Sequence, residues 1–206
     1  MTFYDYLLEK YGFNEPILTS EIQYKSYSKP WLYKAVNTLV REGKLIKFDS
    51  GIYYIPQDTP FGKSKLNPNK VIEKKYINNG SDVIGYYSGV SFLNMIGMST
   101  QIANKIEIYT NNETANFREV SVGKQRLILR RARVNITKEN APVLSLLEMM
   151  NFVSADFFGE TEKKLASEYV EKNRIMRSDI TKYAPYFPDK SLRTFVESEV
   201  VYDIPK

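Results

Sequence analysis

The run of residues 28–56 constrains the fold of this chain more than any other segment. Its apolar residues recur with the 3.6-residue period of an α-helix, at Leu32, Ala35, Val36, Leu39 and Val40. Ser28 can cap such a helix, Pro30 suits its first turn, and Gly43 stops it. The sequence therefore predicts an amphipathic helix that begins after Ser28 and ends at Gly43.

Two short β-prone runs follow this helix directly. Residues 44–48 and 52–56 are separated by Asp49-Ser50-Gly51, and a glycine-containing turn between two such runs predicts a β-hairpin. Lys44 and Lys47 would place positive charge on this hairpin.

Two further helices are expected upstream. An apolar face formed by Tyr4, Leu7, Leu8 and Tyr11 predicts a first helix that Gly12 ends. Thr19 and Ser20 can cap a second helix of about two turns, running to about Lys25. Three helices followed by a hairpin is the plan of a winged helix-turn-helix domain, which we expect over residues 1–62.

The turn formers between Pro56 and Pro68 predict a link to a second domain, residues 69–206. Helices are expected near 69–79, 90–96, 143–153 and 160–172, an interrupted helical stretch over 178–197, and strands over 105–110, 118–122 and 127–134. Residues 199–203 could form a last strand or a tail. The expected fold class is α+β: the winged helix-turn-helix, then a mixed α/β C-terminal domain with a helical tail.

Composition argues against most enzyme chemistry. The chain has no cysteine and no histidine, which removes disulfides, the usual metal sites and histidine acid–base catalysis. Glu73-Lys74-Lys75 and Glu162-Lys163-Lys164 match only the end of a nuclease motif, and both lie in helical stretches. We expect no catalytic site, no metal and no cofactor, and therefore a protein that is not an enzyme.

Cellular location can also be predicted from the sequence. The N-terminus lacks the features of a signal peptide, and no apolar run approaches the ~18 residues of a membrane helix. A cytoplasmic protein with no membrane partner is expected.

Positive charge gathers around the best-defined helix. Residues 25–47 hold six basic side chains against Glu42 alone, although the whole chain has a net charge of only +5. If the apolar stripe faces the core, the opposite face can read bases in the major groove and contact phosphates. The expected DNA-binding residues are Lys29, Trp31, Tyr33, Lys34, Asn37, Thr38, Arg41, Lys44 and Lys47. A merely solvated helix face is the alternative.

A second basic cluster lies in the C-terminal domain. It comprises Lys124, Arg126, Arg130, Arg131, Arg133 and Lys138, with no acidic residue between positions 120 and 138. Strand alternation predicts Arg131 and Arg133 on one face and Arg130 on the other, so that the cluster cannot make one flat patch. A second DNA contact, an acidic protein partner and simple solvated charge all remain open for it.

Several short motifs resemble the AbiEi-type antitoxins of type IV toxin–antitoxin systems. They are Leu39-Val40-Arg41-Glu42-Gly43-Lys44, Gly51-Ile52-Tyr53-Tyr54-Ile55-Pro56 and, in the second half, Gly97-Met98-Ser99-Thr100-Gln101 and Ile106-Glu107-Ile108-Tyr109-Thr110. The resemblance covers roughly residues 15–150 and leaves residues 151–206 without a role.

The resemblance implies an abortive-infection antitoxin that acts in phage defence. Such a protein binds double-stranded DNA at repeats in its own promoter, as a monomer or dimer, and represses that operon. It also opposes a nucleotidyltransferase-like toxin, without needing a stable complex. Two other functions remain open: a nuclease or other enzyme targeted to DNA by a winged helix, and a protein-interaction module.

Overall fold

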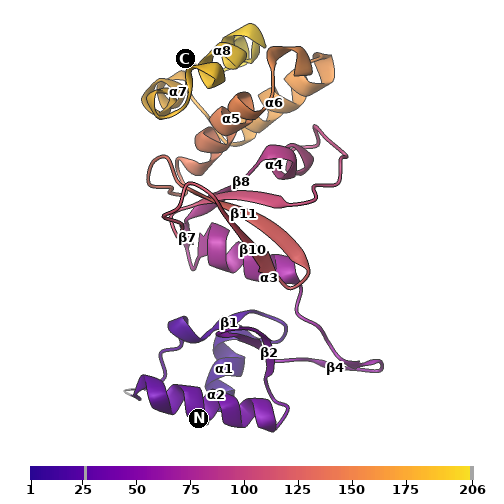
Figure 1. Ribbon diagram of the computed structural model, residues 1–206, viewed down its shortest axis with the longest axis vertical. Coiled ribbons are helices and arrows are strands. Elements are labelled where there is room, and N and C mark those ends of the chain that lie inside the picture. The colour runs from indigo at the N-terminus through magenta and orange to yellow at the C-terminus, as the bar shows by residue number, and fades with distance from the viewer. Residues whose placement is uncertain (26, 205–206) are drawn as a thin grey trace. The chain divides into compact units, whose positions relative to one another are not determined.

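The computed structural model describes residues 1–25 and 27–204. Ser26 and residues 205–206 lie outside the described residues. Residues 205–206 belong to the predicted C-terminal domain. The chain forms two compact units (Figure 1). Unit 1 is Met1–Lys74 with Val122–Lys124, and unit 2 is Lys75–Ser121 with Gln125–Lys206. Both combine helices with small sheets, so the fold is mixed α+β.

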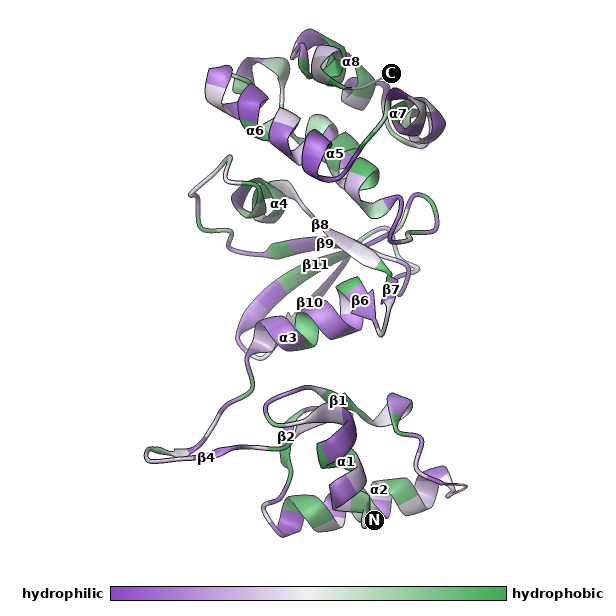
Figure 2. Cartoon of the chain, turned by 180° about the vertical axis from the view of Figure 1, so that it is seen from behind, coloured by the Kyte–Doolittle hydropathy of each residue, from purple (hydrophilic) through white to green (hydrophobic). Residues whose placement is uncertain are grey.

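Unit 1 is built on two helices and a three-stranded sheet. Its elements are α1 (Phe3–Tyr11), β1 (Ile17–Leu18), the 3-10 helix η1 (Thr19–Glu21), α2 (Lys29–Arg41), β2 (Ile46–Asp49) and β3 (Ile52–Tyr54). The sheet is antiparallel, with the order β1-β3-β2. Leu7 of α1, Val36 and Leu39 of α2, and Leu45 pack together in its core. The predicted amphipathic helix and hairpin are both confirmed, and Figure 2 shows hydrophobic and hydrophilic residues alternating along α2.

The predicted second helix is wrong beyond its first turn. The Thr19 hydroxyl was expected to cap it, but this hydroxyl donates to the Gly51 carbonyl at 3.3 Å, and the Thr19 amide reaches the same oxygen at 2.9 Å. After Glu21 the chain leaves the helical conformation: Ile22 has an extended backbone, Ile22 and Tyr24 are buried while Gln23 between them is exposed, and Lys25 lies in a turn with φ +50°.

The segment predicted as a link contains a small hairpin, β4 (Asp58–Thr59) with β5 (Gly62–Lys63). Ser64 closes its base, because the Ser64 amide donates to the Gln57 carbonyl and the Gln57 amide donates to Ser64 Oγ. Tyr54 Oη also donates to the Ser64 carbonyl at 3.2 Å. Figure 1 shows the hairpin projecting from the body of unit 1. After it come α3 (Pro68–Ile72) and the π-helix η2 (Glu73–Ile77).

Unit 2 contains a four-stranded sheet in the order β10-β11-β9-β8. The strands are β8 (Gly85–Ser88), β9 (Ile106–Thr110), β10 (Arg118–Val122) and β11 (Gln125–Arg131). β8 and β9 are antiparallel, whereas β9 and β11 are parallel. A two-residue hairpin, β6 (Asn78–Asn79) with β7 (Asp82–Val83), precedes the sheet, and α4 (Gly89–Met95) connects β8 to β9.

The C-terminal helices belong to the core of unit 2 and are not an appended tail. They are α5 (Ala141–Phe152), η3 (Ala155–Phe157), α6 (Glu160–Lys172), α7 (Arg177–Tyr183), η4 (Ala184–Tyr186), α8 (Asp189–Glu197) and η5 (Val200–Asp203). α5 packs on β8 and α4 on one side and on α8 on the other (Figure 1). Phe92, Leu146 and Phe195 are buried in one cluster with Val200 and Ile204. Residues 200–203 are helical, so a last strand there is wrong.

Among residues 1–25 and 27–204, no helix is both long and apolar enough to cross a membrane.

Candidate nucleic-acid interface

α2 separates its buried and exposed side chains cleanly. Val36 and Leu39 face the core of unit 1, because they lie three residues apart on one side of the helix. An exposed row at four-residue spacing runs along one flank of this buried side, where its first two members share a hollow with Val36: Lys29, Tyr33, Asn37 and Arg41. The face expected from the sequence is therefore presented to solvent.

A second set of predicted residues lies beside this row. Lys34, Thr38 and Lys44 line one hollow of about 450 Å³, together with Trp31. The Thr38 hydroxyl donates to the Lys34 carbonyl at 3.0 Å, so this hydroxyl is engaged by the helix backbone. The structure thus brings predicted residues of α2 and of the following segment to one open surface.

The predicted cations differ in how well their charge is compensated. Lys44 Nζ lies 2.9 Å from Glu42 Oε2, and the hydrogen bond to Glu42 raises the pKa of Lys44. Lys29, Lys34 and Arg41 have no ion-pair partner among the residues that the structure describes, and the same holds for Lys47 on β2. These four cations supply uncompensated positive charge around α2.

Trp31 is engaged in packing. Its ring stacks on Tyr27 with centroids 4.0 Å apart and meets the ring of Phe3 edge-on at 5.6 Å. The ring is half-buried in this aromatic cluster, whereas Tyr33, 54% exposed, is open to a ligand. Of the two predicted aromatic contacts, Tyr33 has the more accessible ring.

The turn of the predicted hairpin is held against the rest of unit 1. Besides the bonds of Thr19 to the Gly51 carbonyl, the Ser50 amide donates to Asp49 Oδ1 at 2.6 Å. The Ser50 amide is therefore already bonded within the turn. On this hairpin the exposed Lys47 is the group best placed for a phosphate.

The β4–β5 hairpin is a candidate that sequence reasoning missed. Phe61 at its tip is 100% exposed, and Lys65 just beyond β5 is exposed as well. Lys63 Nζ donates to the Gly43 carbonyl, next to the C-terminal end of α2, so the hairpin begins beside the exposed row. In the sequence this hairpin is marked by one aromatic residue within a run of turn-forming residues. That run was interpreted as a link between domains.

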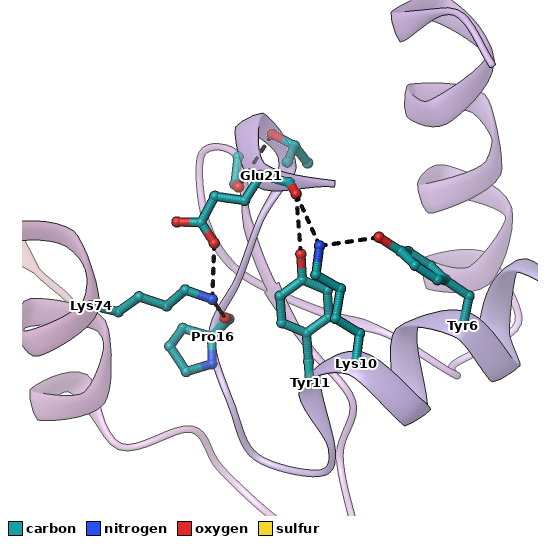
Figure 3. A network of polar contacts seen from close by, with 8 residues as sticks. Tyr6, Lys10, Tyr11, Pro16, Glu21 and Lys74 are labelled. Carbon is teal, nitrogen blue, oxygen red and sulfur yellow. Dashed lines mark hydrogen bonds and ion pairs between the residues drawn. The ribbon is translucent and has the colours of Figure 1, made fainter. Parts of the chain in front are cut away.

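A polar network fixes η1 against α1 (Figure 3). Tyr11 Oη and Lys10 Nζ both donate to the Glu21 carbonyl, while Lys74 Nζ lies 3.0 Å from Glu21 Oε2 and donates to the Pro16 carbonyl at 2.8 Å. Partial burial raises the pKa of Tyr11. Lys74, from the Glu73-Lys74-Lys75 fragment, thus has a structural role in unit 1.

Part of the second basic cluster converges, contrary to the sequence prediction. Arg130, Arg131 and Arg133 line one cavity of about 600 Å³ in unit 2, with Tyr109, Asn116 and Tyr186. Arg130 and Arg131 are the last two residues of β11 and both line the cavity at the end of the strand, whereas strand alternation does not govern Arg133, which lies beyond β11. Lys124 lies in the turn that belongs to unit 1, and Arg126 does not line the cavity.

Two of these arginines are held by carboxylates. Arg130 Nε pairs with Glu107, and Arg133 Nε lies 3.0 Å from Oε2 of the buried Glu148. Partial burial opposes ionisation of Arg133, but the hydrogen bond and charge of Glu148 raise its pKa. Burial raises the pKa of Tyr109, whose hydroxyl donates to Glu148 Oε1 at 3.0 Å. Arg131 is exposed and has no ion-pair partner among the described residues.

Neither protein-family models nor curated proteins give a match to this chain. The structure adds that no group of three or more carboxylates in the described part of the chain is arranged to hold a metal ion.

Proposed function

We propose that this chain is a DNA-binding transcriptional regulator in which α2 lies in the major groove. The observation that carries the proposal is the exposed row of Lys29, Tyr33, Asn37 and Arg41, because its cations are uncompensated and its side chains match base edges and phosphates. A solvated helix face requires no such concentration of unpaired positive charge.

The arrangement of unit 1 supports this reading. α1, β1, η1, α2 and the β2–β3 hairpin follow one another in the order of a winged helix, with β1 paired to β3. η1 stands in the place of the second helix. We infer a winged helix-turn-helix whose second helix is reduced to one turn and whose recognition helix is α2.

The motif resemblance makes the proposal more specific. We infer a cytoplasmic antitoxin and autorepressor of a type IV toxin–antitoxin operon, which binds promoter repeats as a monomer or dimer and opposes a nucleotidyltransferase-like toxin. A gel-shift titration of the full chain on the duplex upstream of its gene tests the DNA-binding step. We expect a shift that a scrambled duplex of the same length does not compete away, and equal binding to both duplexes would contradict sequence-specific regulation.

Binding should be strongly salt-dependent. If the four uncompensated cations Lys29, Lys34, Arg41 and Lys47 each neutralise a phosphate, the plot of log K against log salt should fall with a slope of about −3.6, at ~0.9 per phosphate. Lys47→Ala should make the slope shallower by about 1. Arg193→Ala, which removes the same charge from an exposed position on α8 of unit 2, is the matched control. A flat plot for the unaltered chain would contradict phosphate contact.

Phe61 should contact DNA as an apolar wedge. Since the hairpin begins beside the C-terminal end of α2, we expect its tip to reach the adjacent minor groove, where exposed phenylalanines can unstack and bend a duplex. Phe61→Ala should weaken binding about tenfold, equivalent to ~1.4 kcal/mol, and reduce bending in a circular-permutation gel assay. Phe61→Leu, which keeps an apolar tip, should retain most of both, and unchanged bending in Phe61→Ala would exclude the wedge.

A further inference from the structure

The cavity lined by Arg130, Arg131 and Arg133 is the second site that the structure offers, and it lies wholly within unit 2. Its volume of about 600 Å³ falls in the range of small-molecule pockets, which is roughly 300–1,000 Å³. It is lined mainly by arginines, tyrosines and an asparagine. An apolar ligand would leave these groups unsatisfied, so the lining selects a polar and charged one.

The charged residues around the cavity determine whether the ligand is an anion or a cation. Glu107 compensates Arg130 and Glu148 compensates Arg133, while Arg131 is left with no partner among the described residues. The cavity therefore carries an excess of one positive charge. The two carboxylates bind their arginines through Nε, and no hydrogen bond of the terminal Nη groups is found in the described part of the chain. Guanidinium Nη groups are strong donors to phosphate oxygens.

Arg133 is also held in place before any ligand arrives. The guanidinium of Arg133 lies 5.1 Å from the ring centroid of Phe187 and 5.7 Å from that of Tyr109. Glu148, its carboxylate partner, is itself bonded by Tyr109 Oη and by Asn151 Nδ2, both at 3.0 Å. Because this network restricts Arg133 in the free protein, binding costs less side-chain entropy.

Aromatic rings complete the site. Tyr109 and Tyr186 both line the cavity, and Tyr186 is 54% exposed, so a planar ring can reach its face. Arginines that bind phosphate next to a tyrosine that stacks on a planar ring form the combination that binds nucleotides.

We propose that this cavity binds a free nucleoside polyphosphate, with its phosphates on Arg130, Arg131 and Arg133 and its base on Tyr186. The proposal concerns unit 2 alone and does not depend on DNA binding by unit 1. It gives the part of the basic cluster that lines the cavity one chemical role, the recognition of phosphate in a small ligand.

Isothermal titration of the full chain tests this assignment with ATP and GTP as probes, and with inorganic triphosphate and adenosine as the two halves of the ligand. We expect at least one of the two nucleotides to bind, inorganic triphosphate to bind more weakly, and adenosine not to bind. No heat of binding from either nucleotide at millimolar concentration would overturn the proposal. Binding of only a 5′-phosphorylated oligonucleotide would overturn the assignment to a free nucleotide.

Two variants separate the roles of the lining residues. Arg131→Ala should weaken both nucleotide and triphosphate binding by at least about tenfold, the loss expected for one charge-assisted hydrogen bond. Tyr186→Ala should weaken nucleotide binding but leave triphosphate binding unchanged. Both residues are exposed, so the fold should survive. Arg193→Ala, an exposed arginine of α8 outside the cavity, is the matched control. Equal effects of Arg193→Ala and Arg131→Ala would reduce the site to nonspecific attraction of anions and overturn the proposal.

Discussion

Replacing Lys34 and Arg41 together by alanine is expected to weaken binding to the upstream duplex by about thirtyfold to twenty-thousandfold. Each cation should contribute ~1–3 kcal/mol if it contacts a base. The two residues lie two turns apart on α2 and share no partner, so their contributions should add. Both side chains are exposed, and their removal should leave the circular dichroism of the chain unchanged.

A second double variant makes this test specific. Lys190→Ala with Arg193→Ala removes the same charge from exposed positions on α8 of unit 2. Gel-shift titrations at one salt concentration should show a much smaller loss for this pair. Wild-type affinity in the α2 double variant, or equal losses of affinity in the two double variants, would contradict the assignment of α2 as the recognition element.

Phe195→Ala is expected to destabilise unit 2 by about 3–5 kcal/mol, the usual cost of truncating a buried phenylalanine. Phe195 is 0% exposed, and its ring fills the cluster formed by α5, α8 and η5. Urea denaturation followed by circular dichroism measures the change. Val196→Ala, at the neighbouring exposed position, should change the free energy of unfolding by less than about 0.5 kcal/mol. A loss below about 1 kcal/mol for Phe195→Ala would mean that α8 is only loosely attached.

Local patterns predicted the elements whose own residues determine them. α2 has a clear apolar period that ends at a glycine, and it begins after Ser28 as predicted, although the Ser28 side chain makes no capping hydrogen bond; α6 was expected over the residues that it occupies, 160–172. Both are amphipathic helices on the surface of their units. The spacing of apolar residues identifies such helices well, because one side of each helix faces water.

Long-range contacts determined what the sequence could not predict. The Thr19 hydroxyl could either cap a helix or bond to the hairpin turn. Only the position of Gly51, far along the chain, decided between these two roles. The parallel pairing of β9 with β11 likewise depends on how distant strands meet. α5 is buried on almost every side, so no periodic pattern marks which residues face which neighbour.

The candidate sites show the same division. The exposed cations of α2 were found from the sequence because helical spacing places them. The arginine cavity was missed because it depends on where β11 ends and on η4, which brings Tyr186 to the same place. The nucleic-acid function itself stays a prediction.

The position of Trp31 has a practical consequence. It is the only tryptophan in the chain, and it lies in the aromatic cluster of unit 1 beside α2. Its fluorescence emission therefore reports on the integrity of unit 1, whereas far-ultraviolet dichroism sums over both units. Two denaturation curves that separate would show independent unfolding, and curves that coincide would show one cooperative transition. Quenching of the same emission would also follow a ligand arriving at α2, with no label attached.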